Sequence, residues 1–555
     1  MRDQAWLDAP EHAAALIRMS ARDVRDPARG CPQWRASRAR PAICSRPNLR
    51  KAKAPVQHTD HAVDGVLDLV EFRGRSAGRA QQEYQAAEGR RCDSGLLRWA
   101  EHAVGQYLRA SAELPAVPGA VMAPWSREWA IQYEQGGLRE FRVQGRRYAS
   151  ADGRIRELRI MHTGSLEDRG SDPAVAAVAA YVLAFGRPVL GGKWDVPLVV
   201  GKIPTEVDRI RVIDIGLLDG SWNVVFDGDR NQASAAFRTE AFPSIKAIAD
   251  GREFRPGNDC ARCYLRRDCP ALPRRAGLLG IQDTTRRARS FSITNGRQHD
   301  RCPRQSRLRE LWLPYPKEAE YDEAARLGQA VHEWLEHAHR RSPDRACGPR
   351  ETPSPPDDWS VGRWAVRGDS ALLGVQLIGD HALICPLRTG ATITGVRPEH
   401  STVVYDPDAD VVVHAKSDLV YTDGDVLVVR ETKTTSQEHE RDLLRRYPQI
   451  ALAVVLAAER VLGDDPALTR VELELLTPAG PFKSTFHPAD PGLVQAAREV
   501  VHDLAAAWHA DTEWAPRPGW ACGRCEVSRW CPDRLNDTGD TTPGDLTGPD
   551  LGEAE

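Results

Sequence analysis

Two oppositely charged side chains stand two residues apart in the stretch "VVRETKTT", residues 428–435. Side chains alternate along a β-strand, so Glu431 and Lys433 share one face if this stretch is extended. A solvated ion pair on a strand is the more common meaning of such a tripeptide. A catalytic meaning requires further ligating groups from elsewhere in the chain.

The sequence upstream supplies a second carboxylate on an expected hairpin. β-Branched runs at 411–413 and 426–429 flank the Asp-Gly dipeptide at 423–424, which is typical of a hairpin turn. Asp418 lies on the first strand, and the hairpin brings it across from Glu431. Two carboxylates that converge with a lysine suit a metal-dependent phosphodiesterase, in which the oxygens hold Mg²⁺ or Mn²⁺ and the ammonium orients water or offsets developing charge.

A helix expected over residues 324–340 supplies an imidazole. Gly328 and His332 lie four residues apart, beside a buried stripe formed by Leu327, Val331, Trp334, Leu335 and Ala338. Because glycine costs a helix about 1 kcal/mol relative to alanine, its use suggests that another segment approaches the helix next to His332. Considered without the rest of the chain, this helix favours the interpretation that His332 is a buried core or interface residue over a role in catalysis. His337 and His339 are expected on the solvated face.

Residues 441–461 predict a further helix, with Gln449 near its start. Gln449 could contact a phosphate or a base, and an exposed helical glutamine explains it equally well.

The cysteines form two sets with the same spacing. Each half contains Cys-x2-Cys-x5-Cys followed by Pro, and each offers an upstream Cys-Pro; the sets are Cys31, Cys260, Cys263 and Cys269, and Cys302, Cys522, Cys525 and Cys531. Four thiolates suit either a structural zinc or an iron–sulfur cluster, and the spacing does not separate the two. The remaining cysteines, Cys44, Cys92, Cys347 and Cys385, are expected to be ordinary small apolar residues.

This repeat predicts duplication of a whole domain. The first cysteines of the two sets are 271 residues apart and the last are 262 apart. A basic stretch with Pro and Gly, residues 273–290, marks the boundary. We therefore expect one domain over 1–285, a second over 286–535, and a disordered acidic tail over 536–555.

Composition excludes some classes of protein. The chain of 555 residues carries a formal charge of −3, so it is no uniformly basic nucleic-acid binder. It has no run of 18 apolar residues and no signal-peptide core at its start, so we expect a cytoplasmic protein with no membrane association. In that compartment its twelve cysteines favour metal ligation over disulfides.

Taken in order, these parts resemble the RecB-type nucleases of the PD-(D/E)XK superfamily. The resemblance covers about residues 288–535 and rests on the Cys-Pro, "LGQAVH", the strand aspartate, "ETK", the Gln-bearing helix and the terminal cysteines. It is nearest to members with an iron–sulfur cluster, such as the CRISPR adaptation nucleases and the nuclease domains of AddAB-type enzymes. One departure is Ala453, which stands where the family usually has a tyrosine four residues after the glutamine.

The resemblance implies a fold and roles for single residues. The fold is α/β, with two tandem restriction-endonuclease-like domains, each a central mixed β-sheet flanked by helices and closed by a four-cysteine cluster. His332, Asp418 and Glu431 would bind Mg²⁺ or Mn²⁺ beside the Thr432 carbonyl, and Lys433 would be catalytic. Gln449 would bind substrate, with Tyr447 as a loose substitute for the missing tyrosine. A 4Fe–4S cluster would bind Cys302, Cys522, Cys525 and Cys531, and the first set would hold iron–sulfur or zinc.

The first half does not preserve this chemistry. Aligning Gly153 with Gly424 places Arg147, Ile160 and His162 where the second half has Asp418, Glu431 and Lys433. The match of "LLRWAEH" with "LGQAVH" would make His102 the counterpart of His332. Residues 18–53 hold eleven Lys or Arg against two Asp. This basic segment could contact phosphates or could be a solvated loop, and the sequence supports the two interpretations about equally.

The leading hypothesis is a metal-dependent DNA nuclease, with exonuclease action on single strands or duplex ends, in repair, recombination or defence. A catalytically silent nucleic-acid-binding scaffold or helicase–nuclease subunit is the alternative, and a redox-sensing regulator is a third. The nearest match to a P-loop, residues 186–194, ends in Trp where Ser or Thr is required, so any unwinding would come from a separate helicase.

Overall fold

The computed structural model describes residues 16–26, 28–44, 59–134, 137–167, 172–202, 206–286, 288–315, 323–341, 345–348, 350–389, 392–435 and 442–535. The acidic tail expected over 536–555 lies outside these ranges. Within them, no helix combines the length and apolarity needed to cross a membrane.

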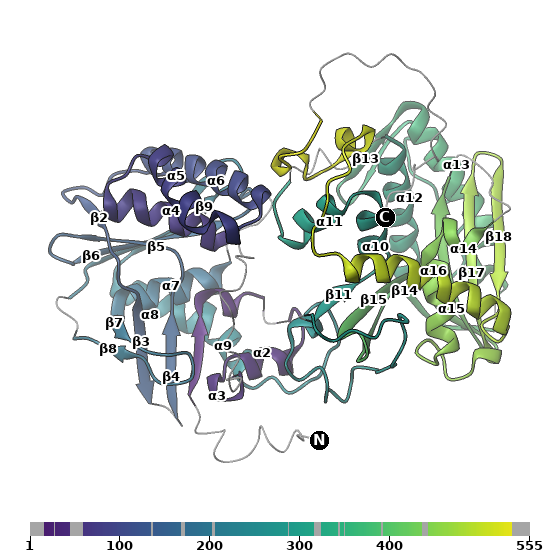
Figure 1. Cartoon of the computed structure of the whole chain (residues 1–555), viewed down its shortest axis with the longest axis horizontal. Helices are drawn as coiled ribbons and strands as arrows, with labels where there is room; N and C mark the ends of the chain where they lie inside the picture. Colours follow the sequence, from purple (N-terminus) through teal and green to yellow (C-terminus); the bar gives the residue numbers. More distant parts are fainter. Residues whose placement is uncertain are drawn as a thin grey trace.

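The first half contains two sheets with a helix between them (Figure 1). One sheet has the order β1 (Ile17–Ser20), β4 (Leu138–Arg142), β3 (Trp129–Glu134), β7 (Arg187–Gly191) and β8 (Val199–Val200). The other has the order β10 (Trp222–Gly228), β9 (Arg209–Gly216), β6 (Ile155–His162), β5 (Arg146–Ser150) and β2 (Met122–Pro124). Helix α7 (Pro173–Phe185) is apolar on all sides because it packs against both sheets in one core.

Further helices cover this half. The second sheet's outer face packs against α4 (Thr59–Arg73) and α6 (Ser94–Glu113), with α5 (Ala77–Glu88) alongside. The shorter helices are α2 (Pro32–Arg38), α3 (Pro41–Cys44), α8 (Arg230–Ala236) and α9 (Phe242–Ala249).

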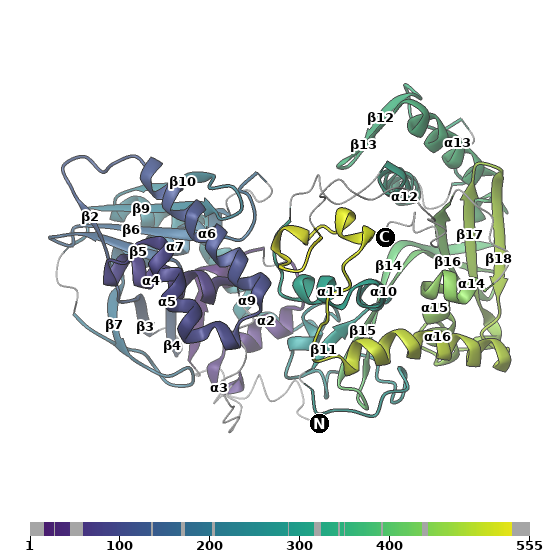
Figure 2. The ribbon, with the colours of Figure 1, turned by 45° about the horizontal axis from the view of Figure 1, so that its top comes forward.

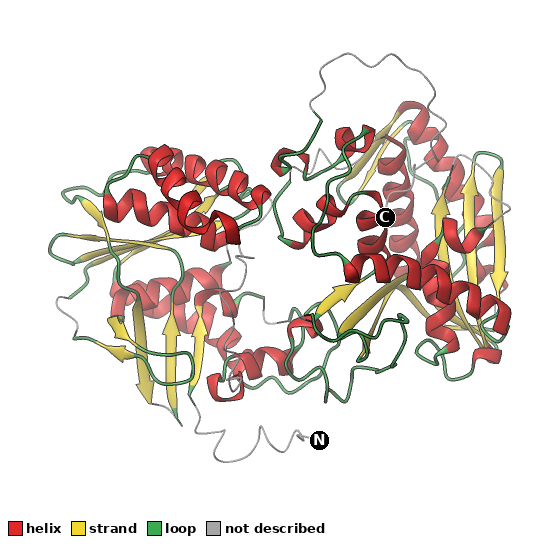
Figure 3. Cartoon of the chain, viewed as in Figure 1, coloured by secondary structure: helices red, strands yellow, loops and turns green. Residues whose placement is uncertain are grey.

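The second half is built on one sheet with helices on both faces (Figure 3). The strand order is β11 (Arg289–Phe291), β15 (Val411–Asp423), β16 (Val426–Thr434), β17 (Thr469–Thr477) and β18 (Gly480–Phe486), and β14 (Ile393–Asp406) pairs with β15. On one face lie α15 (Pro448–Ala458) and α16 (Pro491–Ala510). On the other lie α12 (Glu323–Arg341), α13 (Gly368–Ile384) and the hairpin β12 (Asp358–Val361) and β13 (Trp364–Arg367). The remaining helices are α10 (Ile293–Arg301), α11 (Pro303–Glu310) and α14 (Leu443–Arg446).

Two of these sheets share one plan. In the first half β2/β5 and β5/β6 are antiparallel, β6/β9 is parallel and β9/β10 is antiparallel. In the second half β14/β15 and β15/β16 are antiparallel, β16/β17 is parallel and β17/β18 is antiparallel. A helix, α7 or α15, follows the third strand of each series. The expected mixed α/β architecture is confirmed.

Each cysteine-bearing segment packs against the opposite half (Figure 2). Trp530 stacks edge-on against Trp99 of α6 at 5.1 Å between ring centroids. In the other direction, Cys260 and its neighbours pack against Tyr405 of β14, and the buried Arg266 guanidinium makes a bidentate salt bridge to Asp410.

The helix expected over 441–461 is interrupted. Tyr447, with φ −122° and ψ 72°, separates α14 from α15. The reason is Pro448, whose ring disfavours helical geometry in the residue before it and lacks the N–H that would continue the helix.

Candidate active site

The two strands of the expected hairpin carry the acidic residues, and the turn between them contains Gly424 at φ +60°. Leu419 pairs with Arg430, so the same register places Asp418 opposite Glu431. Lys433 Nζ lies 3.8 Å from Glu431 Oε2, which shows that these two side chains share a face. The hairpin prediction is confirmed.

Asp418 is held by three groups from two elements. Its Oδ2 accepts a hydrogen bond of 2.7 Å from the Thr432 backbone N–H, and its Oδ1 lies 3.6 Å from His332 Nδ1. Burial raises the pKa of this carboxyl, but the charges of His332 and Lys433 outweigh it and hold the pKa well below its usual range. Asp418 is therefore a carboxylate at neutral pH.

Helix α12 approaches the active-site strand at its glycine. A Cβ on Gly328 would lie 2.8 Å from Thr434 Oγ1 of β16, which is too close for an undisturbed contact. The absence of a side chain lets the helix lie against the strand and brings His332, one turn later, to Asp418. The expectation that a segment approaches the helix beside His332 is confirmed.

Sequence reasoning missed a third carboxylate at the same place. Glu399 of β14 has a left-handed φ of +54° and lies opposite Asp418, since Pro398 pairs with Leu419 and His400 with Ser417. Burial raises the pKa of Glu399, although its ion pair with Lys416 opposes this shift. Glu399 also lines a cavity with His332, Glu336 and Asp418. Only the folded backbone reveals this position, because nothing in the local sequence marks the irregular strand.

Helix α15 positions Gln449, and the carboxamide oxygen and nitrogen of that residue are both buried without a hydrogen-bond partner in the described part of the chain. Buried amides are almost always hydrogen-bonded, so this pair of atoms is suited to a polar ligand. Tyr447 is fully buried in the apolar core between α15, α16 and the sheet. A substrate contact by Tyr447 stays a prediction.

The first cysteine set converges in space. Cys31, Cys260, Cys263 and Cys269 line one cavity, although Cys31 lies more than 220 residues before the others. The backbone N–H of Arg255 donates to Cys31 Sγ at 3.4 Å and that of Gly257 donates to Cys260 Sγ at 3.3 Å. Burial raises the pKa of Cys260 to about 11 and of Cys263 to about 12.

Three cysteines of the second set, Cys302, Cys525 and Cys531, also lie close together. Burial raises the pKa of Cys525 to about 12, with further contributions from Cys302 and Cys531, which lie close by. The backbone N–H of Arg517 donates to Cys302 Sγ at 3.5 Å. Cys522 precedes Cys525 by three residues in the same turn.

Three residues that the sequence suggested were inert or solvated, His339, Cys347 and Cys385, lie together, and two of them are buried. His339 is 4% exposed and Cys385 is 3% exposed, and both lie beside Cys347 and His381. The expectation of a solvated His339 was wrong because α12 is covered by α13 on this side. Its spacing from Leu335 and Val331 along the buried stripe is the signal that could have shown this.

Comparison with known proteins gives one family. Residues 290–532 match the model described as the PD-(D/E)XK nuclease superfamily. No curated protein matches the chain. A solved structure titled "Crystal structure of SSO0001" is similar at 16% identity and a TM-score of 0.25, over 47% of this chain and 96% of that one. The family model spans the hairpin, the helix of His332 and the second cysteine set, and residues 290–532 are therefore a domain of the PD-(D/E)XK nuclease superfamily.

Proposed function

We propose that the protein is a divalent-metal-dependent DNA nuclease whose active centre lies between α12, β15 and β16. The observation that carries the proposal is the meeting of His332, Asp418, Glu431 and Lys433 from two separate segments. A solvated ion pair on a strand edge would not explain why Gly328 lets α12 pack closely against β16. It would also not explain why the imidazole of His332 lies beside Asp418.

The donor set fits a hard divalent cation. Asp418 and Glu431 offer carboxylate oxygens, the Thr432 carbonyl is adjacent in the chain, and His332 adds an imidazole nitrogen, all of which Mg²⁺ or Mn²⁺ accept. A bound ion of this kind supplies Lewis acidity and lowers the pKa of water. Glu399 faces the same cavity and is an additional candidate ligand.

The chain's own residues then account for the remaining requirements. The Thr432 N–H fixes the orientation of the Asp418 carboxylate. Lys433 provides a positive charge beside the reacting phosphate, where negative charge increases in the transition state. Gln449, whose amide has no hydrogen-bond partner among the described residues, would contact the substrate backbone. Since the Lys433 side chain is only 11% exposed, its charge is weakly screened by solvent.

We further propose that the first half is a copy of the nuclease domain without its metal site. Its second sheet has the same strand order and sense as the catalytic sheet. At the aligned positions Ile160 is buried in the core, and His162 Nε2 lies 3.1 Å from Asp214 Oδ1 instead of meeting a carboxylate pair. This half would position DNA.

Part of the basic region in this half has a structural role. Arg18 is 3% exposed and its Nε donates to Glu140 Oε2 at 2.6 Å, while Arg40 donates to backbone carbonyls of Ala36 and Ala249. These guanidinium groups are not available to phosphates. Phosphate contact is therefore proposed only for the exposed members of residues 18–53, and residues 45–53 lie outside the described ranges.

The two cysteine sets are proposed to hold 4Fe–4S clusters, with zinc as the alternative. Among the described residues, a group with all its ligand atoms within 4.8 Å of one another occurs at His339, not at either cysteine set. A tetrahedral zinc with Zn–S bonds of about 2.3 Å needs sulfur atoms only about 3.8 Å apart. The looser arrangement supports a polynuclear cluster.

The experiment compares cleavage of linear and circular DNA, each single- and double-stranded, with Mg²⁺, Mn²⁺ or EDTA. We expect metal-dependent cleavage that requires ends, as for an exonuclease, and its loss in Asp418→Asn. The matched control is Asp423→Asn, which alters a carboxylate of the same hairpin that pairs with Arg470 at the surface. Cleavage by Asp418→Asn at the wild-type rate, or no cleavage by the wild type with any substrate, would contradict the proposal. Unwinding of long duplexes by a helicase partner remains a separate proposal.

A further inference from the structure

Four ligating side chains meet beneath the nuclease site, apart from both cysteine sets. They are His339 near the end of α12, Cys347 in the segment that follows, His381 in the last turn of α13, and Cys385 directly after it. Their ligand atoms all lie within 4.8 Å of one another. Three of the four residues are buried.

The distances agree with one tetrahedral ion. His339 Nε2 lies 3.5 Å from Cys347 Sγ and 3.9 Å from Cys385 Sγ. Bonds of about 2.3 Å to sulfur and 2.0–2.1 Å to nitrogen at tetrahedral angles require nitrogen and sulfur ligands to be about 3.6 Å apart. These two distances match that separation, and the other ligand atoms lie within 4.8 Å of one another.

His381 has the hydrogen-bonding pattern of a metal ligand. Its Nδ1 lies 2.6 Å from Glu474 Oε1, and its Nε2 is buried, with only the Cys385 thiol as a polar neighbour in the described part of the chain. The side chain is 1% exposed, so water does not satisfy that nitrogen. A carboxylate that holds one nitrogen of an imidazole while the other faces a metal is the usual arrangement around bound zinc.

We propose that His339, Cys347, His381 and Cys385 bind one structural Zn²⁺. Two nitrogen and two sulfur ligands in a tetrahedral, closed arrangement suit zinc. Two histidines and two cysteines also bind the two irons of a Rieske cluster, but that cofactor separates its ligands over two metal ions. The tight grouping favours a single ion.

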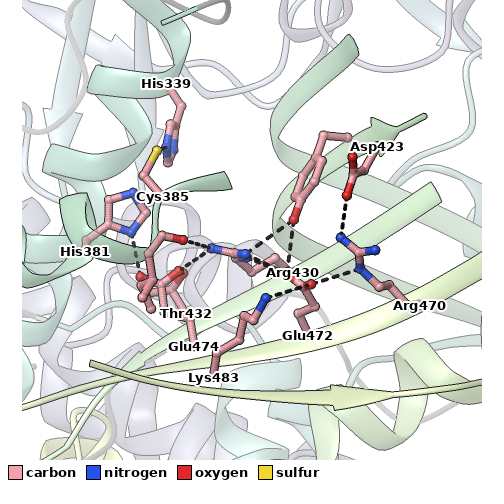
Figure 4. A network of polar contacts seen from close by, with 12 residues as sticks. His339, His381, Cys385, Asp423, Arg430, Thr432, Arg470, Glu472, Glu474 and Lys483 are labelled. Carbon is pink, nitrogen blue, oxygen red and sulfur yellow. Dashed lines mark hydrogen bonds and ion pairs between the residues drawn. The ribbon is translucent and has the colours of Figure 1, made fainter. Parts of the chain in front are cut away.

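The site would connect the nuclease helix to the nuclease strand (Figure 4). His339 lies seven residues after His332, two turns further along the same face of α12. On the other side, Glu474 accepts hydrogen bonds from Arg430 Nη1 at 3.3 Å and Thr432 Oγ1 at 3.4 Å, and both donors belong to β16. Zinc would thus fix α12, α13 and β16 relative to one another and set the place of His332 beside Asp418.

The test measures metal in the purified full-length chain and does not depend on nuclease activity. Zinc and iron per chain are determined by plasma mass spectrometry for the wild type, Cys347→Ser, Cys385→Ser and the control Cys92→Ser. Cys92 is a half-buried thiol 3.8 Å from the Tyr84 hydroxyl in the first half. We expect the first two variants to lose one equivalent of zinc each with iron unchanged, and the control to lose none. Equal zinc in all four proteins, or a loss of iron instead, would overturn the proposal.

A second measurement requires no variant and covers the case in which those variants do not fold. X-ray absorption at the zinc edge of the wild type should show nitrogen ligands at about 2.0–2.1 Å together with sulfur ligands at about 2.3 Å. A zinc shell of sulfur alone, an absence of zinc, or a disulfide between Cys347 and Cys385 in peptide mass spectra would each refute the site. Failure of DNA cleavage with zinc present would refute the proposed nuclease and leave the zinc site intact.

Discussion

Replacing Lys433 with alanine separates chemistry from folding in this site. Lys433 Nζ lies 3.8 Å from Glu431 Oε2, and its charge also lowers the pKa of Asp418. The change removes the ammonium beside these carboxylates that the proposed nuclease mechanism requires. We expect cleavage to fall sharply while DNA binding is retained.

The size of the loss follows from electrostatics. Two unit charges 3.8 Å apart interact by about 4 kcal/mol at an effective dielectric constant of 20. Removing a preorganised charge or donor from the place where negative charge develops commonly costs about 2.7–4 kcal/mol. This corresponds to a decrease of about 10²–10³-fold in the rate of the chemical step.

The assay is single-turnover cleavage of end-labelled DNA with enzyme in excess, so that product release does not limit the rate. Affinity is measured in parallel by fluorescence anisotropy in Ca²⁺. The control is Lys483→Ala, because Lys483 lies on β18 with its side chain 43% exposed and pairs with Glu472 at 3.5 Å. A Lys433→Ala rate within threefold of wild type, or an equal loss in the control, would refute the catalytic assignment.

Three further changes test the packing around the site. Arg430→Met removes the guanidinium that pairs with the buried Glu472 and Glu474, so the free energy of unfolding in urea should fall by about 3–5 kcal/mol. A change near zero would show that these ion pairs do not stabilise the fold. Gly328→Ala brings a methyl group to 2.8 Å from Thr434 Oγ1, and the resulting shift of α12 should lower the cleavage rate by about tenfold or more. Adding Thr434→Ala should restore the rate, and no recovery in the double variant would argue against the clash. Trp530→Ala removes a buried ring from its contact with Trp99 and should lower stability by about 3–5 kcal/mol and speed proteolysis between the halves; unchanged proteolysis would mean that other contacts suffice.

The active-site hairpin and its helix could be predicted because local patterns determine them. β-Branched runs around an Asp-Gly turn place Asp418 opposite Glu431, and the apolar period of residues 324–340 places Gly328 and His332 on one face. The close approach at Gly328 was also inferable, because a helix glycine next to a functional group needs a reason. These features depend on residues within one or two turns of each other.

The residues that were missed depend on tertiary packing. Glu399 lies in the site because its own backbone is left-handed within β14. No pattern in "RPEH" predicts that conformation. The group formed by His339, Cys347, His381 and Cys385 has no familiar ligand spacing, and its members meet only because α13 lies over α12. Pro448 was a readable signal that the helix over 441–461 would be interrupted.

The packing of Trp530 on α6 has a consequence for synthesis. The ring of Trp99 belongs to a helix made early, whereas Trp530, which packs on it, emerges from the ribosome more than 400 residues later. During that interval the nascent first half exposes an aromatic surface, which is the kind of surface that chaperones bind and that promotes aggregation. Chains released prematurely by truncation would keep this surface uncovered, so quality control has a direct means of recognising them.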